Sequence, residues 1–164
     1  MIVDQDLLEK LILPKVERPA QYVGGEYNMI LKDWDAAPVK MCFAFPDTYE
    51  IGMSHLGLRL LYDTTNNHSP HLCERAFMPL DDMAALLKAN HIPLFSWESH
   101  HSLADFDIVG FTLQYELSYS NILSMLDLAG IPVLAADRSE NDPLIIAGGP
   151  CVYNPEPLAD FIDF

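Results

Sequence analysis

Residues 107–130 read DIVGFTLQYELSYSNILSMLDLAG, an apolar run followed by a segment with helical spacing. The run at 107–113 is nearly continuous in apolar residues, which is typical of a strand that is covered on both faces. In 118–130 the apolar residues Ile122, Met125, Leu126 and Ala129 recur along one side of a helix, as core residues do. A strand that leads into a helix of about three turns is the repeating unit of a parallel α/β sheet.

The same unit recurs on both sides of this stretch. The sequence predicts strands at 39–45, 72–77, 93–97, 107–113 and 143–148, a short apolar segment at 131–135 and the beginning of one more strand at 160–164. Helices are predicted at 52–67, 80–90 and 118–130. Because right-handed crossovers place such helices on both faces, the predicted fold class is α/β, with a doubly wound, mostly parallel sheet of flavodoxin-like order.

Residues 1–38 read differently from the rest of the chain. An amphipathic helix at 6–13 ends at Pro14, and Gly24-Gly25 between AQYV and EYNMI predicts a hairpin. We therefore divide the chain into an N-terminal accessory arm with a helix and a hairpin, 1–38, and an α/β domain, 39–164. The predicted last strand stops on an apolar residue without a turn, so we expect the domain to be truncated at its C-terminus.

Composition limits the classes of function. The chain has 164 residues, 50% of them hydrophobic, and a formal net charge of −15, which disfavours direct binding to nucleic acid. No apolar run has the length of a membrane span, and acidic residues stand where a signal peptide would be basic, so we expect a cytoplasmic protein. Cys42, Cys73 and Cys151 are too far apart in sequence to suggest a metal site or a disulfide framework.

Ligands of open parallel sheets bind beyond the carboxyl ends of the strands. Gly148, Gly149 and Pro150 follow the strand at 143–148, and two glycines there remove the side chains that would hold a ligand away from the backbone. The alternative is a tight turn that only redirects the chain. The same rule selects the loops at 46–54, 79–82, 96–99, 112–116 and 148–154.

Several common sites are absent from these loops. The loop at 46–54 lacks both the P-loop pattern and the Gly-x-Gly-x-x-Gly of dinucleotide folds, and it has no Ser/Thr-rich cradle for FMN. A phosphoacceptor receiver would need a Lys at the position of Gly148. The pairs His68/His71 and His100/His101 lack helical ligand spacing, so we expect solvated loop histidines and no metal ligands.

Four blocks of the sequence resemble an uncharacterised subgroup of the radical SAM proteins that carry a cobalamin-binding domain. They are ERPAQYVGGEYN at 17–28, FAFPDTYEIGMSHLGLRLLY at 43–62, DIVGFTLQYELSYSNILSMLDLAGIP at 107–132 and IIAGGPCVYNPEPLADFID at 145–163. The resemblance implies an N-terminal corrinoid-binding-like, Rossmann-like domain. It also implies a partner in cis, a downstream barrel with a [4Fe–4S] cluster and S-adenosylmethionine.

The barrel's Cys-x-x-x-Cys-x-x-Cys motif is absent from this sequence, so the chain is not expected to be catalytic by itself. The cobalamin motif Asp-x-His-x-x-Gly is also altered around His55, where Met53 and Leu58 replace the Asp and the Gly. The resemblance therefore implies cobalamin bound without a histidine axial ligand. The alternative is a degenerate, cofactor-free module that docks the barrel.

On the cobalamin interpretation, the cofactor-binding residues come from three of the selected loops and from the residue after the first. Residues 114–116 would form a second wall of the site, although Glu116 could instead cap the following helix. The candidates are Asp47, Tyr49, Glu50, Ser54, His55, Thr112, Gln114, Tyr115, Glu116, Gly148, Gly149 and Pro150.

Overall fold

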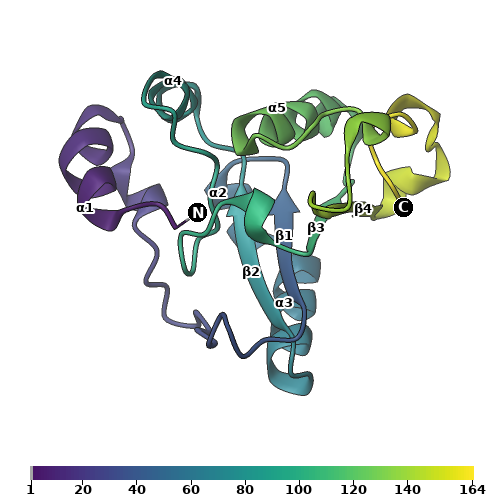
Figure 1. Ribbon diagram of the computed structural model, residues 1–164, viewed down its shortest axis with the longest axis horizontal. Coiled ribbons are helices and arrows are strands. Elements are labelled where there is room, and N and C mark those ends of the chain that lie inside the picture. The colour runs from purple at the N-terminus through teal and green to yellow at the C-terminus, as the bar shows by residue number, and fades with distance from the viewer. Residues whose placement is uncertain (1) are drawn as a thin grey trace.

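The computed structural model describes residues 2–164 and has a four-stranded, all-parallel sheet at its centre (Figure 1). The strands are β1 (Lys40–Phe45), β2 (Leu72–Phe77), β3 (Ile108–Thr112) and β4 (Leu144–Gly148), and their order is β2-β1-β3-β4. The predicted α/β fold class is confirmed. The order places β2 on one side of β1 and β3 on the other, so the sheet has its switch point between β1 and β3.

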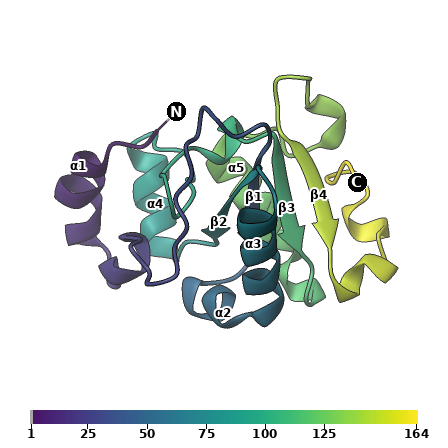
Figure 2. The ribbon, with the colours of Figure 1, turned by 90° about the horizontal axis from the view of Figure 1, so that it is seen from below.

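Helices cover the two faces of the sheet unequally. The face that carries Cys42, Val109 and Ile145 packs under α4 (Asp81–Ala89) and α5 (Tyr119–Ala129), and these three side chains are fully buried. The other face packs against α2 (Tyr49–Ser54) and α3 (Leu56–His68), which lie on the opposite side of the sheet from α5 (Figure 2). Leu144 on that second face is 46% exposed. The α3 side of β3 and β4 is therefore only partly covered.

The predicted helix at 52–67 is divided in two. His55 has an extended backbone, with φ −77° and ψ 111°, and it separates α2 from α3. Its imidazole Nδ1 accepts a hydrogen bond from the backbone N–H of Leu58 at 3.1 Å, so His55 is the N-cap of α3. A histidine is an unusual capping residue, which is why the sequence pattern did not show this break.

The segments at 93–97 and 131–135 do not form strands. The backbone N–H of Trp97 bonds to the carbonyl of Arg75 at 2.7 Å, and Phe95 makes one antiparallel bridge with Ser102. Single bonds of this kind do not continue into a ladder. The predicted strand at 160–164 does not form either: Phe164 N–H donates to Ile145 O at 3.3 Å and Ala147 N–H donates to Phe164 O at 2.9 Å, but these bonds do not extend into a ladder.

The N-terminal arm packs along the outer side of β2 and does not form the predicted hairpin. It contains α1 (Gln5–Leu7), a π-helix at Leu8–Ile12 and short 3-10 turns at Leu13–Lys15 and Pro19–Tyr22. Gly24 and Gly25 have the positive φ that the turn pattern predicted, but neither flank is a strand. The arm bonds to side chains of the domain instead, since Ile30 N–H donates to the Tyr62 hydroxyl at 2.8 Å.

Candidate functional site

The loops that follow β1 and β3 meet above the switch point of the sheet. The Tyr115 hydroxyl donates a hydrogen bond to Asp47 Oδ2, and the Asn121 side chain donates to the carbonyl of Pro46 at 3.0 Å. The bond to Asp47 raises the pKa of the Tyr115 phenol above its usual value. Asp47 and Tyr115, predicted from separate loops, are thus brought together, and their contact spans the mouth between β1 and β3.

Beside this contact lies an apolar cavity of about 340 Å³ between the N-terminal end of α3 and the exposed side of β1, β3 and β4. We call it the glycine slot, because four glycines line it. Five of the predicted site residues are among its walls, namely His55, Thr112, Gln114, Gly148 and Gly149. The other lining residues are Met41, Phe43, Gly57, Leu58, Leu61, Gly110, Phe111, Ile146 and Ala147.

The two glycines at the end of β4 have different roles. A Cβ atom on Gly148 would meet no atom within 4 Å, so this residue leaves open space at the slot. Gly149 has φ +112°, a region essentially limited to glycine, and a Cβ there would lie 2.8 Å from the carbonyl oxygen of Leu113. Gly148 therefore fits the predicted close approach of a ligand, whereas Gly149 is required by the fold.

Polar groups of the slot come from β3 and from the cap of α3. The Gln114 amide Nε2 donates to Thr112 Oγ1, which leaves Gln114 Oε1 as an acceptor. The ring of His55 packs on Phe45, with ring centroids 5.2 Å apart, while its Nδ1 caps α3. None of the residues that line the slot carries a formal charge, which suits a neutral ligand group.

The predicted residues of α2 do not reach the slot. Tyr49 stacks on Trp97 with ring centroids 5.2 Å apart, and its hydroxyl donates to Glu26 at 3.2 Å. Glu50 accepts a hydrogen bond from Arg18 at 3.0 Å and therefore holds the arm. Ser54 bonds to the carbonyls of its own helix, at the end of α2. Glu116 and Pro150 are exposed and are not among the lining residues either.

Sequence reasoning missed the floor of the slot. Gly110 lies in the middle of β3, where a Cβ would meet Met41 at 2.8 Å and Ile146 at 3.4 Å. A glycine inside a strand often marks a place where a ligand or another backbone approaches closely, so Gly110 was a usable signal. Met41, Phe43 and Leu61 carry no such signal, because apolar residues of a strand or helix are first assigned to the core.

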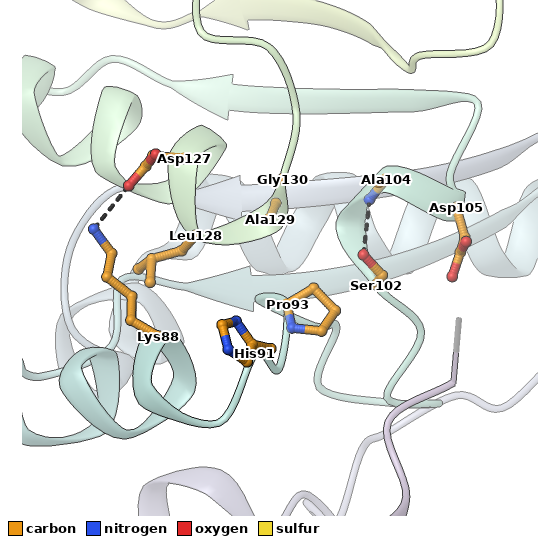
Figure 3. Close-up of a pocket in the computed structure, with 10 residues that line it drawn as sticks. All are labelled: Lys88, His91, Pro93, Ser102, Ala104, Asp105, Asp127, Leu128, Ala129 and Gly130. Carbon is orange, nitrogen blue, oxygen red and sulfur yellow. Dashed lines mark hydrogen bonds and ion pairs between the residues drawn. The ribbon is translucent and has the colours of Figure 1, made fainter.

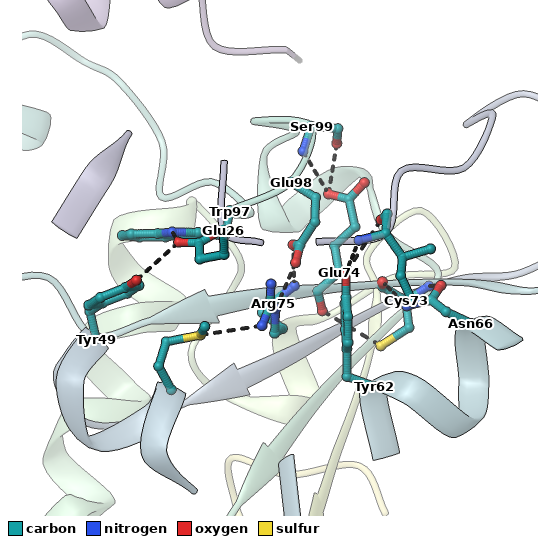
Figure 4. A network of polar contacts seen from close by, with 12 residues as sticks. Glu26, Tyr49, Tyr62, Asn66, Cys73, Glu74, Arg75, Trp97, Glu98 and Ser99 are labelled. Carbon is teal, nitrogen blue, oxygen red and sulfur yellow. Dashed lines mark hydrogen bonds and ion pairs between the residues drawn. The ribbon is translucent and has the colours of Figure 1, made fainter. Parts of the chain in front are cut away.

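A second polar cluster is buried at the edge of β2 (Figure 4). Arg75 Nε donates to Glu98 Oε1 and Arg75 N–H donates to Glu98 Oε2, each at 2.7 Å, and both side chains are almost fully buried. The hydroxyl of Ser99 donates to Glu74 at 2.7 Å and contacts His101 Nδ1 at 2.6 Å. This cluster joins β2 to the segment after α4, which lies beneath the arm, and we assign it to stability.

His101 corrects the expectation of solvated loop histidines. It is 9% exposed, and its ring stacks on Trp34 of the arm with centroids 3.5 Å apart and planes 2° apart. Burial lowers the pKa of the His101 imidazole. A loop histidine followed by a serine gives no local sign of this contact, because Trp34 lies far away in the sequence.

Glu98 gives the protein a pH-dependent stability. Burial outweighs the attraction of Arg75 and raises the pKa of the Glu98 carboxyl from 4.5 to about 7. The folded state then binds this proton more tightly than the unfolded state does. The contribution of Glu98 to stability is full below pH 4.5 and is lost as pH rises through about 7.

We therefore expect the wild type to lose stability relative to Glu98→Gln between pH 4.5 and 7.5, because glutamine does not titrate. Urea unfolding of both proteins across this range measures the difference between their free energies of unfolding. Other titrating groups are common to both proteins, so their contributions cancel in this difference. A difference that stays constant or grows with pH would show that Glu98 is ionised throughout.

A larger cavity, of about 630 Å³, lies at the opposite end of the sheet (Figure 3). It is bordered by the C-terminal ends of α4 and α5, with an exposed ion pair between Lys88 and Asp127 at 2.7 Å, and by residues 102–105, which lead into β3. None of the predicted site residues line it. It lies at the amino ends of the strands, where ligands of parallel sheets do not normally bind.

Residues 2–164, the part of the chain that the structure describes, lack two further features. They contain no helix that is long and apolar enough to cross a membrane. Among the same residues no group of three or more His, Cys, Asp or Glu side chains is arranged to hold a metal ion.

Comparison with known proteins identifies the family. No curated protein and no solved structure matches the chain. A family model described as "Radical SAM proteins, N-terminal" matches residues 57–164, about two thirds of the chain. The match includes α3 except its first residue, all of β2, β3 and β4, and most of the slot. The chain therefore belongs to the family of N-terminal regions of radical SAM proteins.

Proposed function

We propose that this chain is a corrinoid-binding-like N-terminal domain that positions cobalamin beside a radical SAM barrel located downstream in the same protein. The observation that carries the proposal is the glycine slot. It extends to the carboxyl ends of β3 and β4, where Thr112, Gly148 and Gly149 line it, and its lining is mostly apolar and carries no formal charge. Family membership supports the proposal that the protein is a radical SAM protein, and the slot supports the proposal that this domain binds cobalamin.

The size of the slot limits what it can take. Small-molecule sites measure about 300 to 1,000 Å³, and the slot, at about 340 Å³, lies at the low end of this range. It fits one flat part of a corrinoid, not the whole molecule. The predicted residues that lie outside the slot and are available to contact the remainder are Asp47, Tyr115, Glu116 and Pro150.

The residues present fit a corrinoid that has no protein ligand on cobalt. When bound, cobalamin supplies a cobalt centre suited to methyl transfer or rearrangement, with the iron–sulfur cluster and S-adenosylmethionine in the barrel. This domain would bind and orient it: Gly148 leaves room, Phe43 and Ile146 exclude water, and Thr112 and Gln114 offer polar contacts. In the same proposal the protein is cytoplasmic and this domain does not contact nucleic acid.

Gly148→Leu tests the slot directly. The added side chain would occupy open space, so we expect the free energy of unfolding to change by less than about 1 kcal/mol. Hydroxocobalamin, titrated by visible absorbance, should bind the wild type saturably in the micromolar range and should bind Gly148→Leu at least tenfold more weakly. The proposal fails if the wild type does not bind at millimolar ligand, or if both proteins bind equally.

A second candidate function is a cofactor-free module that docks the barrel. Exposed leucines of α3 favour it, because Leu56, Leu60 and Leu61 are 66%, 58% and 52% exposed, and of these only Leu61 lines the slot. An apolar surface of this kind is suited to another protein surface. This candidate predicts that Leu60→Gln weakens association with the separately purified barrel, and that hydroxocobalamin does not bind at all.

A further inference from the structure

The slot contains one imidazole, that of His55, whose Nδ1 is engaged by a backbone hydrogen bond. The Nδ1 atom of His55 accepts the N–H of Leu58 at 3.1 Å, so Nδ1 must carry a lone pair. In a neutral imidazole the proton then resides on Nε2, which is a hydrogen-bond donor. Within residues 2–164 no hydrogen bond to Nε2 occurs, and the ring lines the slot.

This tautomer prevents His55 from acting as a metal ligand through Nε2. Coordination would require a lone pair on Nε2 and would move the proton to Nδ1, where it would face the N–H of Leu58. The cap of α3 would then be lost, at the point where the chain separates α2 from α3. The fold therefore uses the lone pair that a metal would need.

We propose that His55 is a specificity-determining residue, which donates its Nε2–H to an acceptor atom of a neutral, flat heteroaromatic group in the glycine slot. The surroundings select such a group: apolar walls on both sides, no charged lining residue, and Gln114 Oε1 as the complementary acceptor. The inference rests on the proposed function for the identity of the whole ligand. The class of ring that the slot prefers follows from the slot alone.

Two bicyclic probes of nearly equal shape test the inference. Benzimidazole has a ring nitrogen that accepts a hydrogen bond, and indole has a carbon at that position. We expect the wild type to bind benzimidazole about tenfold more tightly than indole, the ratio that one hydrogen bond provides. Amide chemical shifts of Gly110 and Gly148 report binding in the slot, and Gly148→Leu should bind neither probe.

His55→Asn is the matched variant, because asparagine keeps an oxygen that can cap α3 but is too short to donate across the slot. We expect its thermal unfolding midpoint to stay near that of the wild type, and the preference for benzimidazole to fall to about twofold or less. A preference that persists in a folded His55→Asn protein would overturn the inference. Equal binding of both probes by the wild type, or no binding of either, would also overturn it.

Two measurements on the wild type hold even if His55→Asn fails to fold. Long-range ¹⁵N–¹H correlation spectra of the imidazole should show a protonated Nε2 and an unprotonated Nδ1, and the opposite tautomer would contradict the inference. With bound cob(II)alamin, a nitrogen splitting in the paramagnetic resonance spectrum that disappears in His55→Asn would also contradict it. Absence of corrinoid binding refutes the proposed function, while the probe pair still decides the role of His55.

Discussion

Replacement of Glu98 by alanine is expected to lower the free energy of unfolding by about 3 to 5 kcal/mol. The Glu98 carboxylate accepts two hydrogen bonds from Arg75, one from the backbone and one from the side chain, each at 2.7 Å. Alanine would leave the guanidinium buried without its counter-charge and would remove the acceptor of a backbone N–H in β2. Removing one partner of a buried pair costs much more than the pair itself contributes, because the other charge cannot return to water.

Asp127→Ala is the matched control for Glu98→Ala. Asp127 also pairs with a basic residue at 2.7 Å, but the side chains of Asp127 and Lys88 are 58% and 62% exposed. Water solvates both charges after the mutation, so the expected loss is at most about 1 kcal/mol. Urea unfolding well above pH 7, where the Glu98 carboxyl is ionised, measures both variants. Similar losses for the two would show that the Arg75 pair is not held in a dry interior.

Gly149→Ala is expected to destabilise the fold by about 3 kcal/mol or more. Its φ of +112° costs about 1 to 3 kcal/mol for any residue with a Cβ. The Cβ would also lie between 2.8 and 3.2 Å from three backbone atoms of Leu113, which cannot move aside as a side chain could. A shift of Leu113 would weaken its hydrogen bond to Gly148 O and the bond from Cys151 N–H to Leu113 O, each contributing about 1 kcal/mol.

Gly148→Ala provides the comparison at the neighbouring position. Its Cβ would meet no atom within 4 Å, so its unfolding midpoint in urea should lie close to that of the wild type. If Gly149→Ala is as stable as Gly148→Ala, then the backbone conformation assigned to Gly149 after β4, and its close contact with Leu113, are wrong. The difference also matters for binding studies, because loss of binding in a Gly149 variant would report damage to the fold and only Gly148 variants report on the slot.

Long apolar runs explain why the sheet was predictable. The runs that contain β1, β3 and β4 lack the alternation of a one-sided strand, and the helices between them have clear apolar stripes, so the strand type and the order followed. The positive φ of Gly24 and Gly25 was predictable for the same local reason. The predicted hairpin does not form, because residues of the arm make hydrogen bonds with the side chains of Trp97 and Tyr62 instead.

Contacts between distant segments explain what the sequence could not show. Arg75 and Glu98 are 23 positions apart in the sequence and form a hydrogen-bonded ion pair in the fold. The sign of this in the sequence was the Glu74-Arg75 pair inside an otherwise apolar strand, because charged side chains that are buried must find partners. His55 was recognised as a candidate, but its capping role depends on the break between α2 and α3. Tyr49 and Glu50 lie on the α2 turn and were assigned by position in a loop, whereas their contacts are with Trp97 and the arm.

Mapping of hydroxocobalamin binding by amide chemical shifts of the ¹⁵N-labelled protein tests the account most directly. We expect saturable shifts at the walls of the glycine slot, above all at Gly110, Gly148 and Leu58, and little change near Lys88 and Gly130 at the opposite end of the sheet. Shifts confined to that opposite cavity, or no saturable shift at millimolar ligand, would contradict the assignment of the slot as the ligand site.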